Sequence, residues 1–193
     1  MITCASSCLV TSGPDFSEPA QTRPEIVNIA GCQAEPSLAQ IYQFNHEPLA
    51  PYQPAEFQAC FLSEDAGEPV QSALLIDYGT QDPSSEDPYR HGIGGPDLDA
   101  ASLGDGPRRV AIPWTPNHFL DSDKGCHTVT LIVTHRFTHL LGKYYCPQDP
   151  RDASTLTWFV NVCDGTATDP CDLVNCPSSG QSTPTVSCEG VPP

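Results

Sequence analysis

Three histidines near one another in the sequence are the first candidates for chemistry. His127 and His135 lie in one alternating apolar run, and His139 follows shortly after it. On a single strand His127 and His135 would be about 26 Å apart, so they cannot bind the same metal ion. A zinc or copper site at His135 and His139 would need further ligands that the pattern does not supply. We therefore expect exposed histidines at strand ends.

Acidic residues offer a second chemistry, which is calcium binding. The stretch Asp121–Gly125 (DSDKG) resembles the start of a calcium loop, but Cys126 and Ile132 stand where the loop needs glycine and glutamate. Two interpretations stay open for the other loop acids. They form either a solvated acidic surface or a weaker calcium site built from Asp97, Asp99 and Asp105.

Motifs of the common catalytic sites are absent from the sequence. It holds neither G-x-S-x-G nor H-E-x-x-H. A cysteine nucleophile is not expected where most cysteines are oxidised. We predict no catalytic residue and no bound cofactor.

The chain of 193 residues has ten cysteines, a number typical of proteins in oxidising compartments. A zinc site would show C-x2-C pairs, whereas the tightest spacings here are Cys4-x3-Cys8 and Cys171-x4-Cys176, without histidines at ligand spacing. We therefore predict disulfides. The candidates are Cys32, Cys60, Cys126, Cys146, Cys163, Cys171, Cys176 and Cys188.

The formal net charge is −16, from 24 Asp and Glu against 8 Lys and Arg, and no basic cluster exceeds Arg108-Arg109. Nucleic-acid binding needs concentrated positive charge, so this composition argues against it. It also argues against an electrostatic membrane anchor. A soluble, self-repelling surface outside the cytoplasm agrees with the charge.

The elements that must position these residues are strands. The runs that end in Cys126 and Cys163 alternate with a period of two, which favours a β-hairpin. Pairing Val129 with Val160 matches the apolar faces and places Cys126 opposite Cys163. Either these two cysteines bond to each other, or each bonds outward to another segment.

The other apolar runs are also short and are separated by turn residues. We expect strands at 25–30, 39–44, 55–62, 70–79 and 108–114, with Cys60 facing away from the core. About seven strands in roughly 140 residues predict an all-β, immunoglobulin-like β-sandwich. The segment 81–106 is expected to be a long surface loop, with a short helix at Pro96–Leu103 as its best helical candidate.

The ends of the chain differ in composition from the centre. We predict an N-terminal tail at 1–23, the sandwich domain at 24–164 and a Cys/Pro/Ser-rich tail at 165–193. Local disulfides among Cys171, Cys176 and Cys188 would hold this last tail, and their odd number leaves one of them to pair elsewhere. No apolar signal segment follows Met1, so either the start lies upstream or the chain is shortened. Cys8 is the candidate for lipidation, with the polar residues after it as a spacer.

The residues that carry a family resemblance are the early cysteine, the spacer GPDFSEPAQTRPEI and the late stretches GCHTVTLIVTHRF and DPRDASTLTWFVNV. In these the chain resembles uncharacterised lipoproteins of myxobacterial type. The resemblance implies an exported protein with an immunoglobulin-like domain and no assigned activity.

We therefore expect a non-enzymatic module in the periplasm, on the outer membrane or at the cell surface, with envelope or surface proteins as partners. The main alternative is a module that binds carbohydrate or calcium, with Tyr78, Tyr89 and Trp114 as its ligand edge. A small secreted hydrolase is the third interpretation.

Overall fold

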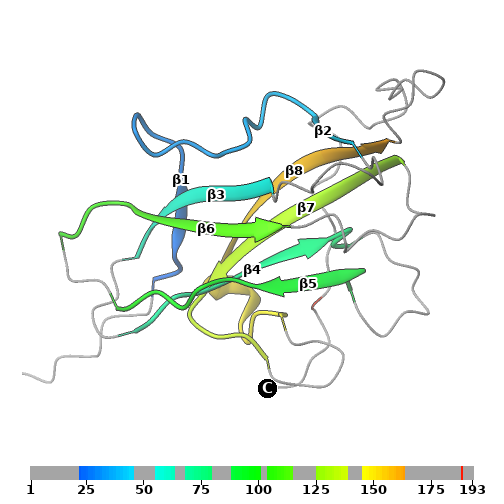
Figure 1. The fold of residues 1–193 in the computed structure, drawn as a ribbon. Helices are drawn as coiled ribbons and strands as arrows, with labels where there is room; N and C mark the ends of the chain where they lie inside the picture. The colour runs from blue at the N-terminus through cyan, green and yellow to red at the C-terminus, as the bar shows by residue number, and fades with distance from the viewer. Residues whose placement is uncertain are drawn as a thin grey trace, which may run out of the picture.

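The computed structural model describes residues 22–45, 55–63, 68–79, 88–100, 104–114, 125–138 and 145–163, together with Cys188. These residues form two β-sheets, one of three strands and one of five (Figure 1). The expected all-β fold is confirmed. The strands are β1 (Glu25–Val27), β2 (Tyr42–Asn45), β3 (Ala55–Leu62), β4 (Gln71–Ile76), β5 (His91–Gly94), β6 (Arg108–Trp114), β7 (Gly125–Thr134) and β8 (Ala153–Cys163).

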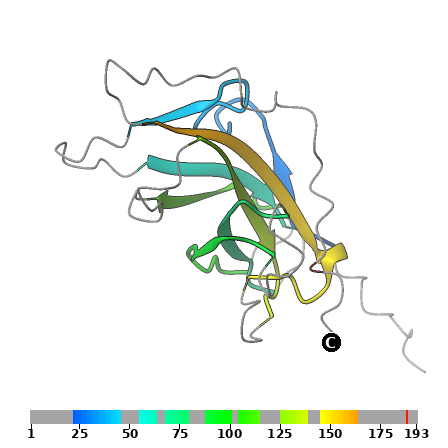
Figure 2. The same ribbon diagram turned by 90° about the vertical axis from the view of Figure 1, so that its right-hand side faces the viewer.

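The smaller sheet has the order β1-β3-β6, and both of its pairings are antiparallel. The larger sheet has the order β2-β8-β7-β4-β5. All of its pairings are antiparallel except that of β2 with β8, which is parallel. In Figure 2 the long β8 curves along its length beside β7.

The main core lies between the two sheets. Alternating residues of β3 and β6 face alternating residues of β4, β7 and β8 across it, as period-two strands require. Phe57 lies at its centre, with its ring centroid 5.1 Å from that of Trp158 and 5.8 Å from that of Trp114. Trp158 also donates from Nε1 to the carbonyl oxygen of Pro36 at 2.7 Å, which satisfies its buried N–H.

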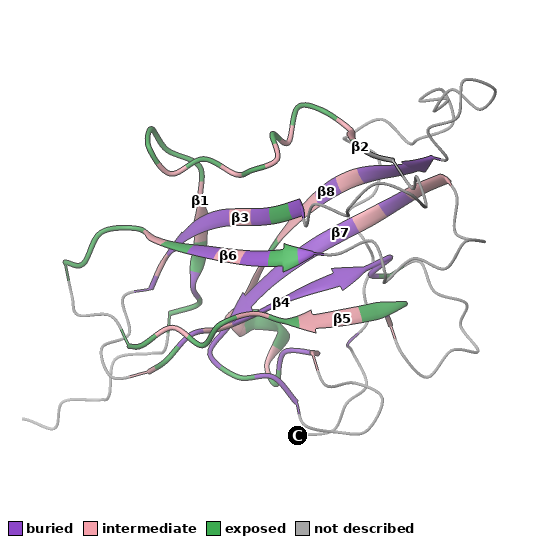
Figure 3. Cartoon of the chain, in the orientation of Figure 1, coloured by how far each residue is buried: buried purple, intermediate pink, exposed green. Residues whose placement is uncertain are grey.

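A second apolar cluster covers the outer face of the larger sheet. Figure 3 shows β4 and most of β7 as buried. Leu74 faces the main core, while its neighbour Leu75 faces the second cluster, and both are fully buried. The second cluster also contains Ala73, Tyr78, Tyr89, Ile132, Phe137, Cys146 and Cys188. The larger sheet is therefore buried on both faces where β4 and β7 lie.

The hairpin of β7 and β8 is present, but its register differs from the predicted one by two residues. Val129 pairs with Trp158 instead of Val160, and Cys126 pairs with Asn161 instead of lying opposite Cys163. A shift of two keeps every apolar side chain on its expected face. Alternation therefore fixed the parity of the pairing and left its register undetermined.

The segment predicted as a long loop holds a strand. β5 pairs with β4 at the edge of the larger sheet. Residues 96–100, the described part of the helical candidate Pro96–Leu103, are not helical. Leu98 exchanges backbone hydrogen bonds of 2.9 Å with Val70, which directly precedes β4. Arg108 of β6 donates to the carbonyl oxygen of Asp99, which links this segment to the smaller sheet.

Candidate functional site

His127 is buried at one end of β7, where it contacts the end of β4. Its Nδ1 lies 2.8 Å from Oδ2 of Asp77, and Nε of Arg90 lies 3.2 Å from the same oxygen. Asp77 has a φ of 53°, a left-handed conformation that aspartate tolerates better than most residues. Its Oδ1 accepts from the backbone N–H of Thr128 at 3.1 Å. The carboxylate therefore joins the end of β4 to β7.

His135 forms a similar pair at the other end of β7. Its Nδ1 lies 2.7 Å from Oδ1 of Asp152, and Oδ2 of Asp152 accepts from the backbone N–H of His135 at 3.1 Å. The hydroxyl of Thr134 donates to Oδ2 at 3.2 Å. The expectation of exposed histidines was wrong, because the carboxylates of Asp77 and Asp152 let both rings be buried without leaving Nδ1 unsatisfied.

Asp152 is held in place by a short 3₁₀ turn, Pro150–Asp152, which precedes β8. Asp149 caps the turn by accepting from the backbone N–H of Arg151 at 2.9 Å, and its two oxygens also accept from the Arg151 guanidinium at 3.1 and 3.0 Å. These hydrogen bonds from Arg151 lower the pKa of Asp149, and they raise the pKa of Arg151 in turn. These bonds therefore join the residue that caps the turn to a residue within it.

A pocket of about 550 Å³ opens beside the His135–Asp152 pair. Its charged lining mixes both signs, with Glu68 and Asp149 against Arg136 and Arg151. A carboxylate that orients an imidazole supplies two of the three members of a nucleophile–base–orienter set, and the third member would be the nucleophile. The described lining of this pocket supplies no serine, threonine or cysteine as the third member. What the pair does in the described residues is join the end of β7 to the start of β8.

The predicted ligand edge was wrong. Tyr78 and Tyr89 are 6% and 7% exposed, and Trp114 is fully buried. Trp114 belongs to the main core, and the two tyrosines belong to the second cluster. Burial raises the pKa of Tyr78 to about 12. Three buried rings form no exposed platform, because the sheet on which the tyrosines lie is covered on its outer face.

Another aromatic residue, which the sequence interpretation did not single out, lines a second pocket. Tyr145 is half-buried and borders a cavity of about 280 Å³ at the place where β4 begins and β5 ends. Gln71, Ser72 and Asp97 contribute the polar side chains of this cavity. The tandem Tyr144-Tyr145 before Cys146 was the only available sequence signal.

The sequence left open whether the loop acids or the histidines bind a metal ion. Within the described ranges no group of three or more His, Cys, Asp or Glu side chains is arranged to hold a metal ion. Asp97, Asp99 and Asp105 are exposed. His139 and Asp121–Lys124 lie outside the described residues.

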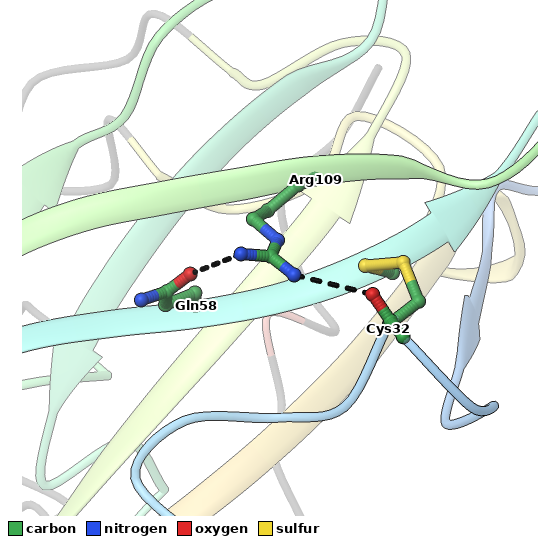
Figure 4. The surroundings of a disulfide bond; sticks show 5 residues. Cys32, Gln58 and Arg109 are labelled. Carbon is green, nitrogen blue, oxygen red and sulfur yellow. Dashed lines mark hydrogen bonds between the residues drawn. A yellow bond between two sulfur atoms is a disulfide. The ribbon is translucent and has the colours of Figure 1, made fainter.

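The first disulfide joins Cys32 to Cys60 on the outer side of the smaller sheet. Cys60 does not belong to the main core, in agreement with its predicted orientation. Arg109, its partner across β3 and β6, donates to Oε1 of Gln58 at 3.2 Å and to the carbonyl oxygen of Gly31 at 3.3 Å (Figure 4). The Cys32–Cys60 disulfide therefore lies under a polar surface.

The second disulfide joins Cys146 to Cys188, so Cys188 is a cysteine of the C-terminal tail that pairs outside the tail. Cys188 is buried in the second cluster, and the hydroxyl of Tyr78 lies 3.3 Å from its sulfur. A disulfide sulfur has no proton, so the hydroxyl is the donor. Cys126 and Cys163 are also disulfide-bonded. The other candidates, Cys8, Cys171 and Cys176, lie outside the described residues.

Comparison with known proteins finds no matching family model, no matching curated protein and no matching solved structure. No helix in the described part of the chain is long and apolar enough to cross a membrane. The fold and the cross-links define a disulfide-bonded all-β protein of two packed sheets. The disulfides Cys32–Cys60 and Cys146–Cys188 indicate an oxidising, extracytoplasmic environment.

Proposed function

We propose that this protein is an exported, membrane-attached, immunoglobulin-like module that acts as a structural or protein-interaction component of a cell envelope, without catalytic activity. The strand order supports the fold assignment. If β1, β3 and β6 are strands A, B and E, then β8, β7, β4 and β5 are G, F, C and C′, and their order is that of the GFCC′ sheet. The resemblance to lipoproteins of myxobacterial type supports export and attachment.

Both histidine–carboxylate pairs support a structural use of residues that could otherwise do acid–base chemistry. Asp77 joins β4 to His127 and Thr128 on β7. Asp152 joins the start of β8 to the end of β7 through its bonds to His135. Each carboxylate thus links strands at one end of the sheet.

The observation that carries the interaction role is the edge strand β6. It has seven residues and, among the described strands, pairs only with β3. An edge strand presents backbone N–H and C=O groups to which a partner can add a strand. Arg108 and Arg109 lie on it, and they are the densest positive charge in a chain of net charge −16. The fitting partner is therefore an extended protein segment that carries acidic side chains.

Pro113 indicates which residues of β6 turn their backbone groups outward. Proline in a sheet is confined to positions whose missing N–H would face solvent. Since such positions alternate, Arg109 and Ala111 would share the outward orientation of Pro113. The N–H of Ala111 is then the central donor available to an added strand.

A photo-crosslinking side chain at Arg109, introduced in the native host, tests this role. We expect an adduct of defined mass with an envelope protein. Ala111→Pro should abolish the adduct, because it removes the outward N–H, while the bonds to β3 and the fold persist. Ala111→Ser keeps the N–H and is the matched control. The absence of an adduct, or an equal yield in Ala111→Pro, would contradict the proposal.

Attachment to a membrane is tested by the mass of the N-terminal peptide of the native protein. Lipidation of Cys8 predicts a peptide heavier by its acyl groups, and Cys8→Ser should release the protein from the membrane fraction. An unmodified Cys8 in membrane-bound protein would contradict the anchor.

A further inference from the structure

The cavity at the start of β4 and the end of β5 combines two aromatic side chains with a few polar ones. It measures about 280 Å³. Small-molecule sites have this composition, in which apolar surface gives affinity and a small number of polar groups fix orientation. Its principal lining residues are Gln71, Ser72, Gly94, Asp97, Phe137 and Tyr145.

Tyr145 is held rigidly at this cavity. Its ring lies against the glycines of β5, so closely that a Cβ atom at Gly92 would be 2.4 Å from Cδ2 of the ring and one at Gly94 would be 3.2 Å from its hydroxyl. Phe137 and Tyr89 contact it from other directions, with centroids 5.9 and 6.2 Å away. The ring remains partly exposed. A half-buried, fixed ring presents apolar surface to a ligand at little cost in conformational entropy.

The polar side chains have defined roles around this ring. Oε1 of Gln71 accepts from the backbone N–H of Phe137 at 3.0 Å, which fixes the amide and leaves Nε2 as the donor group. Ser72 is buried and its hydroxyl donates to the carbonyl oxygen of Pro96 at 3.2 Å, so we assign it no contact with a ligand. Asp97 adds an exposed carboxylate acceptor. The cavity therefore offers both donors and acceptors beside an aromatic surface.

We propose that this cavity is a subsite for one neutral pyranose ring of a glycan. A pyranose has an apolar face that packs on an aromatic ring, and its hydroxyls both donate and accept. Gln71 matches the acceptor oxygens of the sugar, while Asp97 matches its O–H donors. The chain's net charge of −16 disfavours uronic acids and other anionic sugars. A small cavity suits a single ring.

Titration of the isotope-labelled full chain, with its disulfides intact, tests the subsite. The probes are cellotetraose, maltotetraose and chitotetraose, with tetragalacturonate as the anionic control. We expect at least one neutral tetrasaccharide to shift the amide resonances of Gly94, Gly95 and Tyr145 in a saturable manner. Tetragalacturonate should leave these resonances unchanged. The absence of saturable shifts with all three neutral probes would overturn the proposal.

Three substitutions locate the binding. Gln71→Glu keeps the acceptor for the N–H of Phe137 but removes the amide donors, and Asp97→Asn removes the carboxylate charge with little change of shape. Each should weaken binding about three- to ten-fold, the usual effect of one lost hydrogen bond. Asp99→Asn, an exposed acid outside the cavity, should leave affinity unchanged.

A peptide partner at the same place would give a different result. An aromatic or proline side chain of a peptide would use Tyr145 and tolerate both Gln71→Glu and Asp97→Asn. Undiminished binding in both variants, or resonance shifts that cluster elsewhere in the chain, would therefore overturn the sugar subsite. Thermal midpoints of the variants within about 2 °C of the parent would show that lost binding is not lost folding.

Discussion

The outer face of the smaller sheet is polar, whereas the outer face of the larger sheet lies under a second apolar cluster. On the smaller sheet Gln58 and Arg109 bond to each other beside the Cys32–Cys60 disulfide. On the larger sheet Leu75 and the other members of the second cluster are buried beside the Cys146–Cys188 disulfide. The two disulfides therefore lie in different surroundings, one polar and one apolar.

The difference shows what each disulfide does beyond shortening the unfolded chain. Cys32–Cys60 joins segments whose contacts on that face are polar, so its effect is mainly entropic. Cys146–Cys188 holds two members of an apolar cluster together, one of which is remote from the sheet in sequence. Loss of the Cys146–Cys188 disulfide should therefore also expose apolar surface.

The largest expected effect comes from removing the second disulfide. Closing a loop of 42 residues stabilises by up to about 4 kcal/mol in the chain-entropy model. The double variant Cys146→Ala, Cys188→Ala should lose stability of this order in urea unfolding without reductant. It should also bind a hydrophobic dye, because release of Cys188 uncovers the apolar cluster.

Its matched control is the double variant Cys32→Ala, Cys60→Ala. The separation of 28 residues gives a similar entropic loss, about 3.5 kcal/mol, but the polar face above it should bind no additional dye. Equal dye binding by the two double variants would remove the distinction between the faces.

The next effect compares two adjacent leucines on β4. Leu74 faces the main core and Leu75 the second cluster, and neither is exposed. Leu74→Ala and Leu75→Ala should each cost about 2–5 kcal/mol in the free energy of unfolding, as truncations in packed cores do. A loss below about 1 kcal/mol for Leu75→Ala alone would mean that the outer face of the larger sheet is solvated in solution.

Much of this architecture was predictable from sequence, and β3 and β6 match the predicted strands 55–62 and 108–114. Their alternation or β-branched composition is a local property. The two-sided burial of β4 also had a signal, since Ala73–Ile76 is a continuous apolar run, typical of strands covered on both faces. That run predicted a strand but did not identify what covers it.

Other features depended on contacts between distant segments. β5 (HGIG) has two glycines and little intrinsic strand propensity, and the ring of Tyr145 covers the space that side chains would fill. The burial of Tyr89 and the place of Cys188 depend on the same cluster. The His135–Asp152 pair likewise joins the end of β7 to the turn before β8, and the spacing of the two residues alone gave no sign of it.

A smaller effect, dependent on pH, probes the second cluster through Tyr78. Its pKa is raised to about 12 by burial, from an ordinary value near 10. A group whose pKa is raised on folding contributes stability that is fully present below the unfolded pKa. This stability is lost as the pH rises through the folded value. We therefore expect a loss of about 2 kcal/mol between pH 10 and 12.

Tyr78→Phe is the control for this pH dependence. It keeps the ring but removes the ionising hydroxyl, so the difference between parent and variant isolates Tyr78 from the other tyrosines. At neutral pH the variant should lose only about 0.5–1.5 kcal/mol, from the hydrogen bond to the sulfur of Cys188. Parallel stability curves from pH 8 to 12 would show that the hydroxyl is not buried in solution.

The smallest expected effect lies on the polar face of the smaller sheet. Arg109 is exposed, and both of its acceptors, Oε1 of Gln58 and the carbonyl oxygen of Gly31, are neutral. Arg109→Ala should therefore cost less than about 1 kcal/mol. Because neither acceptor is charged, urea unfolding at 0.05 and 0.5 M NaCl should give the same small difference. A loss above 2 kcal/mol would mean that side chains on both outer faces contribute substantially to the free energy of unfolding. A small loss would leave Arg109 available for a partner at β6.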